Sequence, residues 1–155
     1  MNKKLIPQIE WEEDIGLASC TLTDTYDRQY TGTSICHPDD LDMISEKTGC
    51  EIAHRRAEIM MLKGYVKNEL KPRLRALKQL YYSMNRSQYF NEKSYENKML
   101  QSQIRVIKNE LDTTNEIIAE LEYDLGRYLD EKEEFYKKIR RHRKIGSLLK
   151  KDVND

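Results

Sequence analysis

The stretch that decides the fold runs from Leu100 to Ile139, LQSQIRVIKNELDTTNEIIAELEYDLGRYLDEKEEFYKKI. Ten of twelve positions spaced by alternating steps of four and three residues are apolar or aromatic. This spacing places them on one face of a long helix, as in a coiled coil. A helix of this length reaches on the order of 60 Å, which predicts a rod with a small head. The twelve positions are Leu100, Ile104, Ile107, Leu111, Thr114, Ile118, Leu121, Leu125, Tyr128, Lys132, Phe135 and Ile139.

A second apolar stripe precedes this helix. Thr48-Gly-Cys-Glu51 has the Thr-x-x-Glu spacing of a capping box, so we expect a helix to begin at Thr48. Pro72 should kink or interrupt it at about residues 68–71, because proline lacks the backbone N-H. We place the turn between the helices in residues 85–94, which have no clear period. The stripe comprises Ile52, Ile59, Leu62, Val66, Leu70, Leu77, Tyr81 and Met84.

Charge indicates how the two helices pair. Residues 54–78 hold eight Lys and Arg against two Glu, a net charge of +6, and residues 110–134 hold two against ten, a net charge of -8. An antiparallel hairpin folded near residues 90–94 lays one block along the other. A homodimer that pairs the same blocks between chains is equally allowed. We prefer the hairpin within a monomer because the blocks are nearly symmetric about the turn.

The N-terminal third carries a β-type pattern. Residues 15–23 and 30–36 are rich in β-branched side chains and flank the polar segment 24–29, which predicts a β-hairpin. His37-Pro38-Asp39-Asp40 then ends the second strand. We therefore expect a mainly α (α+β) fold. Its parts are a β-hairpin head with a short helical turn at 1–47, completed by the first long helix, a two-helix coiled-coil hairpin at 48–149 and a tail at 150–155.

The head contains a candidate metal site formed by Cys20, Cys36, Cys50 and His54. If the hairpin is centred at Arg28, Cys20 lies opposite Cys36, while Cys50 and His54 share one face of the helix in its first turns, where the dipole favours a thiolate. Two ligands from a hairpin and two from a helix is an arrangement of structural zinc sites. The alternative is that the cysteines are small core residues and His54 lies on the surface. A register shift of one would make His37 the ligand in place of Cys36.

The sequence lacks the motifs of common enzyme classes, so we expect a binding protein and not an enzyme. There is no phosphate-binding loop, nucleophile elbow or dinucleotide fingerprint, and a Cys50/His54 pair lacks an orienting third group. No apolar run reaches the roughly 18 residues of a membrane span, and the N-terminus lacks a signal peptide, which predicts a cytoplasmic protein without membrane contact.

Lys and Arg equal Asp and Glu at 27 each, so any attraction to a charged partner must be local. The C-terminal run 137–151 contains eight Lys and Arg and could grip phosphates. Folded back beside the acidic head, it should be neutralised internally, so nucleic-acid contact is possible but not favoured. The candidate partner-binding cations are Arg55, Arg56, Lys63, Lys67, Arg140, Arg141, Arg143 and Lys144.

Two segments carry a family resemblance. Gly32-Thr-Ser-Ile-Cys-His-Pro-Asp-Asp40 and Gly49-Cys-Glu-Ile-Ala-His-Arg-Arg-Ala57 resemble small phage and prophage proteins, which have Gly-x-x-x-Cys-x-Pro-x-Asp and then Gly-x-x-x-Ala-x-x-Arg-Ala on a helix. Small phage proteins of this build include inhibitors of CRISPR nucleases. The resemblance implies an anti-CRISPR protein that binds a host CRISPR effector nuclease, of type II, and blocks target DNA loading. A coiled-coil assembly protein and a nucleic-acid-binding regulator are the alternatives.

Overall fold

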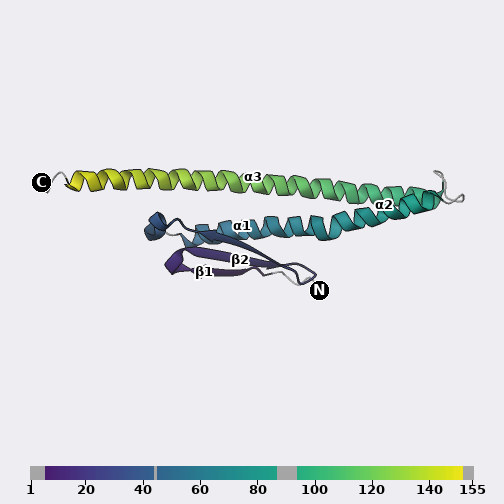
Figure 1. The fold of residues 1–155 in the computed structure, drawn as a ribbon, viewed down its shortest axis with the longest axis horizontal. Helices are drawn as coiled ribbons and strands as arrows, with labels where there is room; N and C mark the ends of the chain where they lie inside the picture. Colours follow the sequence, from purple (N-terminus) through teal and green to yellow (C-terminus); the bar gives the residue numbers. More distant parts are fainter. Residues whose placement is uncertain (1–5, 44, 87–93, 152–155) are drawn as a thin grey trace.

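The computed structural model describes residues 6–43, 45–86 and 94–151. A three-stranded sheet is followed by a helical hairpin, and Figure 1 shows α3 on one side of α1 and the sheet on the other. The main elements are β1 (Gln8–Glu12), β2 (Leu17–Thr23), β3 (Gln29–Ile35), α1 (Glu46–Tyr65), α2 (Lys71–Asn85) and α3 (Tyr95–Lys151). Short 3-10 turns lie at Glu13–Ile15 and Pro38–Met43. The mainly α fold and the antiparallel hairpin predicted from the sequence are therefore confirmed.

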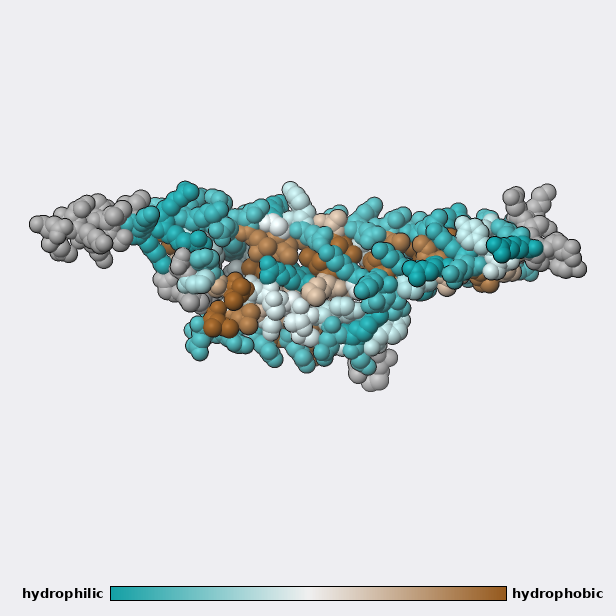
Figure 2. All heavy atoms as spheres, viewed as in Figure 1, coloured by the Kyte–Doolittle hydropathy of each residue, from teal (hydrophilic) through white to brown (hydrophobic). Residues whose placement is uncertain are grey.

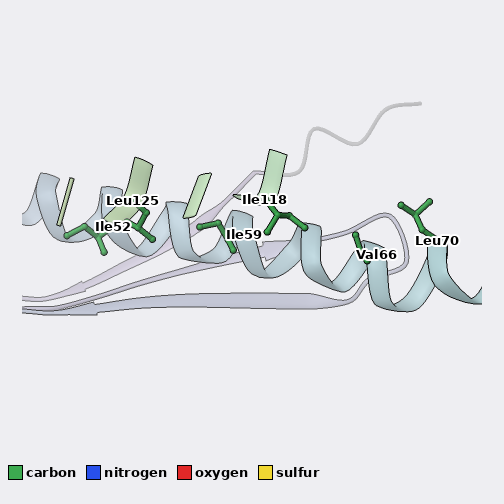
Figure 3. Close-up of a cluster of buried hydrophobic side chains, with 6 residues drawn as sticks. All are labelled: Ile52, Ile59, Val66, Leu70, Ile118 and Leu125. Carbon is green, nitrogen blue, oxygen red and sulfur yellow. The ribbon is translucent and has the colours of Figure 1, made fainter. Parts of the chain in front are cut away.

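The hairpin is held together by the two predicted stripes. Figure 3 shows the side chains of the first helix and of α3 meeting in one buried cluster. At about 1.5 Å per residue, the 57 residues of α3 extend roughly 85 Å. The cluster consists of Ile52, Ile59, Val66, Leu70, Ile118 and Leu125.

The stripe of α3 departs from prediction at its C-terminal end. Phe135 is 56% exposed, whereas Tyr136 is half-buried in its place. A straight α-helix drifts by about 20° per heptad relative to a strict repeat of 3.5 residues. After five heptads the drift turns Phe135 outward and brings the next residue toward the head.

The first long helix begins earlier than expected. Ser45 is its N-cap, with its side-chain oxygen accepting a hydrogen bond from the amide of Thr48 at 3.2 Å, so the predicted cap at Thr48 was wrong. Pro72 does interrupt the regular helix, as predicted. Residues Val66–Leu70 form a π-helix, in which the amide of Lys71 bonds to the carbonyl of Val66, and α2 then continues with Pro72 in its first turn.

The sheet is antiparallel, in the order β1-β2-β3. The predicted hairpin is present as β2 and β3, but its turn is tighter than expected and is centred at Tyr26. The Asp24 carboxylate accepts hydrogen bonds from the amides of Tyr26 and Arg28, and Asp27 takes a left-handed φ of 61°. β1 was not predicted. Its alternation of Ile9 and Trp11 with polar neighbours is the period-two signal that could have revealed it.

The sheet packs on α1 through very small residues. A Cβ at Gly32 of β3 would overlap the carbonyl oxygen of Ala53 and the amide nitrogen of Ala57. A Cβ at Gly49 would come within 3.0 Å of the Trp11 ring. The Gly-x-x-x-Ala-x-x-Arg-Ala segment therefore has a structural role, because its small residues let strand and helix backbones approach closely. Its Arg56 donates a hydrogen bond to the carbonyl of Thr33 on the same strand.

Candidate functional site

A cleft of about 280 Å³ lies where the head meets the C-terminal part of α3. Residues of β3 and the turn after it, of the start of α1 and of α3 line this cleft. Its polar and reactive side chains come from segments far apart in the sequence. The titratable ones are Cys36, His37, Asp40, Arg56, Lys132, Glu133 and Tyr136, and the hydroxyl-bearing residues are Ser34, Ser45 and Thr48.

An ion pair closes one side of this cleft. Asp40 is 2% exposed and accepts two hydrogen bonds from the Arg140 guanidinium, at 3.0 and 2.9 Å. Pro38 and the aspartates after it form the 3-10 turn that points Asp40 toward α3. Arg140 also lies 3.7 Å from Glu133. Because a bidentate pair fixes both position and orientation, it clamps α3 to the head. The Asp40 carboxylate is therefore already engaged within the chain.

The thiol in the cleft is held in its neutral form. Burial, and then the nearby Asp40 carboxylate, raise the pKa of the Cys36 thiol. Burial, with smaller contributions from Cys36 and Asp40, likewise raises the pKa of the Tyr136 hydroxyl. A nucleophilic cysteine needs a lowered pKa. The electrostatics of this cleft therefore favour packing and hydrogen bonding over covalent catalysis by Cys36.

The raised pKa of Cys36 gives a testable pH dependence. Only the thiolate reacts with iodoacetamide, so we expect Cys36 in the folded protein to be alkylated more slowly at neutral pH than in the urea-unfolded chain. The midpoint of its rate-against-pH profile should lie above that of the unfolded chain. Mass spectrometry of peptides after timed alkylation measures both. A folded-state midpoint below the unfolded one would contradict the assignment.

The structure does not bring the four predicted zinc ligands together. Cys20 pairs with Gly32, and the amide of Cys36 bonds to the carbonyl of Gly16. The predicted pairing of Cys20 with Cys36 is therefore wrong, and the two are separated by four residues, or about 13 Å, along the strands. The reason is the tighter turn described above. Among the residues described, no three His, Cys, Asp or Glu side chains lie close enough to share a metal ion. Zinc binding by this chain stays a prediction from the sequence.

Cys50 and His54 also lie in different surroundings. Cys50 packs against the cluster of Ala18 and Cys20 under the sheet, and burial, then Glu46, raises the pKa of its thiol. Burial and the Glu46 carboxylate therefore act against the thiolate that the helix dipole was expected to favour. His54 instead faces a hollow between α1 and α3, which it lines with Leu121.

Half of the predicted partner-binding cations are occupied within the chain. Arg55 binds Glu51 at 2.7 Å and stacks on the Tyr128 ring, while Lys63 pairs with Glu122 across the hairpin. Arg56 and Arg140 bind the head, as described above. The other four side chains are exposed, although Arg143 and Lys144 also have interactions within the protein: Lys67 lies on the π-helix, and Arg141, Arg143 and Lys144 lie near the C-terminal end of α3.

The chain was compared with known proteins at three levels. No protein-family model, curated protein or solved structure matches it. Within the described residues, no helix combines the length and the apolar character needed to cross a membrane.

Proposed function

We propose that this protein is a phage-encoded, non-enzymatic binding protein that occupies a surface of a bacterial host protein. The observation that carries the proposal is the exposed surface of 11941 Å². A compact monomer of 18.5 kDa would expose roughly 8,200 Å². A rod-shaped helical hairpin leaves more of its surface exposed than a globule of the same mass, and it offers two long faces to a partner.

The best specific candidate for the partner is a CRISPR effector nuclease in the host cytoplasm, with target DNA loading blocked sterically. The resemblance of residues 32–40 and 49–57 to small phage proteins supports it. The outer face of α3 supports it as well, because exposed acids recur there every four residues at Asp112, Glu116, Glu120 and Asp124. A row of carboxylates has the charge that a DNA-binding channel attracts.

A pull-down tests this proposal. The tagged protein, incubated with nuclease-treated lysate of a CRISPR-bearing host and washed at high salt, should recover the effector nuclease in near-equal amount. The purified pair should then fail to bind a target DNA duplex in a mobility-shift assay. Glu116→Gln with Glu120→Gln should weaken recovery, whereas Glu10→Gln with Glu12→Gln, an equal charge change on β1, should not.

Two outcomes would contradict the inhibitor. The first is recovery of the bait alone or of virion proteins, and the second is an effector that still loads DNA in the presence of the protein.

An assembly protein is the second candidate. It is favoured by a hollow of about 500 Å³ between α2 and α3, lined in part by Leu77, Val106 and Ile107, with Val106 59% exposed. Light scattering would show a doubled mass if this hollow pairs two copies.

A further inference from the structure

The half of the hairpin that projects beyond the sheet is strongly basic. The ion pair between Arg28 and Glu69, at 3.0 Å, fixes the tip of the β2–β3 turn beside the π-helix. Beyond the π-helix only the two helices remain, and we call the π-helix together with the part of the hairpin beyond it, residues 66–86 and 94–110, the distal arm (Figure 1). The distal arm holds nine Lys and Arg against three Glu, a net charge of +6. We propose that the distal arm binds the phosphate backbone of a nucleic acid.

The charge arises from the register of the hairpin. The acidic block of α3 lies beside the first half of the basic block, as Lys63 with Glu122 and Tyr65 with Glu110 show. The second half of the basic block lies farther along, where Arg73 and Leu77 share a hollow with Gln103 and Val106. This part of α3 is itself basic. The prediction that the two blocks cover each other therefore holds for only part of their length.

Seven of these cations lie on one face of the distal arm. We call the residues that are buried or half-buried between the two helices the helix seam. Each of the seven cations comes directly after a seam residue, as do Lys63 on α1 and Glu122 on α3. Because Lys63 and Glu122 form an ion pair, these positions on the two antiparallel helices point to the same side. The seven are Lys67 on the π-helix, Lys71, Arg75 and Lys78 on α2, and Lys98, Arg105 and Lys108 on α3.

These seven cations are available to a ligand. Six are exposed and Lys78 is half-buried, and none forms an ion pair with any residue that the structure describes. Two of the three Glu of the distal arm are engaged elsewhere: Glu69 binds Arg28, and Glu110 accepts a hydrogen bond from Tyr65. Uncompensated like charges on one face repel one another, so an anionic partner would reduce the repulsion between these cations.

A nucleic acid fits this face better than a membrane does. A membrane-surface helix needs apolar side chains beside its cations, because they insert among the lipids. Here the exposed aliphatic residues Leu80, Met99 and Val106 each precede a seam residue, so they lie on the opposite face. Tyr82, 64% exposed, follows the seam residue Tyr81 and lies on the cation face, where a base can stack on its ring. On the face seen in Figure 2 the arm is largely hydrophilic around a narrow apolar seam. Lys67 to Lys78 spans about 17 Å, over which a duplex presents about five phosphates per strand.

Fluorescence anisotropy with the full chain tests the proposal. The probes are a labelled DNA duplex of about 24 base pairs, the matching RNA duplex and the single strand. With about six phosphate contacts, the affinity for the preferred probe should fall about 10³-fold between 50 and 200 mM salt. Neutralising Lys71→Gln, Arg75→Gln and Lys78→Gln together should reduce the slope of log K against log salt by about 2.7. Comparing the affinities for the three probes shows whether the preferred ligand is duplex DNA, duplex RNA or a single strand.

A matched control separates the distal arm from overall charge. Arg127→Gln, Lys138→Gln and Arg141→Gln remove the same charge from exposed positions of α3 outside the arm, and should leave the slope within about 0.5 of the wild-type value. Circular dichroism should show all three proteins equally helical. Equal losses in the two triple variants, or wild-type binding to phosphatidylserine vesicles but not to any of the three probes, would overturn the proposal.

Discussion

Alanine at Gly32 is expected to lower the free energy of unfolding by about 3 kcal/mol or more, a larger effect than that of any other single methyl group in the head. The added Cβ would overlap two backbone atoms of α1, the Ala53 carbonyl oxygen and the Ala57 amide nitrogen. Backbone cannot rotate away as a side chain can, so the strand and helix must separate. Overpacking a rigid core typically costs about 1 to 3 kcal/mol, and this site lies at the upper end.

Urea unfolding monitored by circular dichroism and by Trp11 fluorescence measures this effect, because Trp11 packs against the buried cluster that contains Ala53 and Ala57. Gly126→Ala is the matched control, because a Cβ there meets open space on α3. It should stabilise the helix by up to about 1 kcal/mol. Should Gly32→Ala unfold at the wild-type urea concentration, the close packing of β3 on α1 would be wrong.

Alanine at Arg140 is expected to be the second most disruptive change, by about 3 kcal/mol. It leaves the Asp40 carboxylate, 2% exposed, without its bidentate partner. Removing one member of a buried ion pair typically costs about 3 to 5 kcal/mol, because the other charge stays desolvated. The end of α3 should then detach from the head, which hydrogen exchange of peptides covering residues 128–143 would detect as loss of protection.

The neighbouring Arg141 provides the control, because it is exposed on the same helix and Arg141→Ala should change exchange in this region little. Asp40→Leu combined with Arg140→Met replaces the pair by apolar groups and should recover much of the lost stability. If Arg140→Ala and Arg141→Ala exchange alike, or if the double variant is no better than Arg140→Ala, the ion pair does not hold α3 to the head.

Periodicity was sufficient to predict the helical hairpin. Residues such as Ile118 and Leu125 recur at helical spacing over so many turns that few other arrangements would bury them. The proline interruption was also predictable, because a missing N-H has a local consequence at Pro72. Such features depend on chain chemistry within a few residues, and a single sequence contains that information.

The head was predicted less well because its details depend on contacts between distant residues. The strand register follows from a turn in which the Asp24 side chain takes two backbone amides, and a shift of this turn moved Cys36 away from Cys20. Tyr136 joins the cleft through the drift of a helix over five heptads, and Arg140 finds Asp40 across a distance of 100 residues. The charge of the C-terminal run did predict that it folds back beside the acidic head, but neither the turn of Tyr136 toward the cleft nor the particular pairing of Arg140 with Asp40 leaves a local pattern in the sequence.

The ion pair between Asp40 and Arg140 has a consequence for the order of synthesis. Because its members are 100 residues apart, the ribosome must synthesise and release residue 140 before the clamp can close. At about 5 to 20 residues per second, the sheet and α1 emerge several seconds before α3 covers them. During that interval the apolar face of α1 is accessible to chaperones. The head reaches its final structure only after residue 140 has been translated.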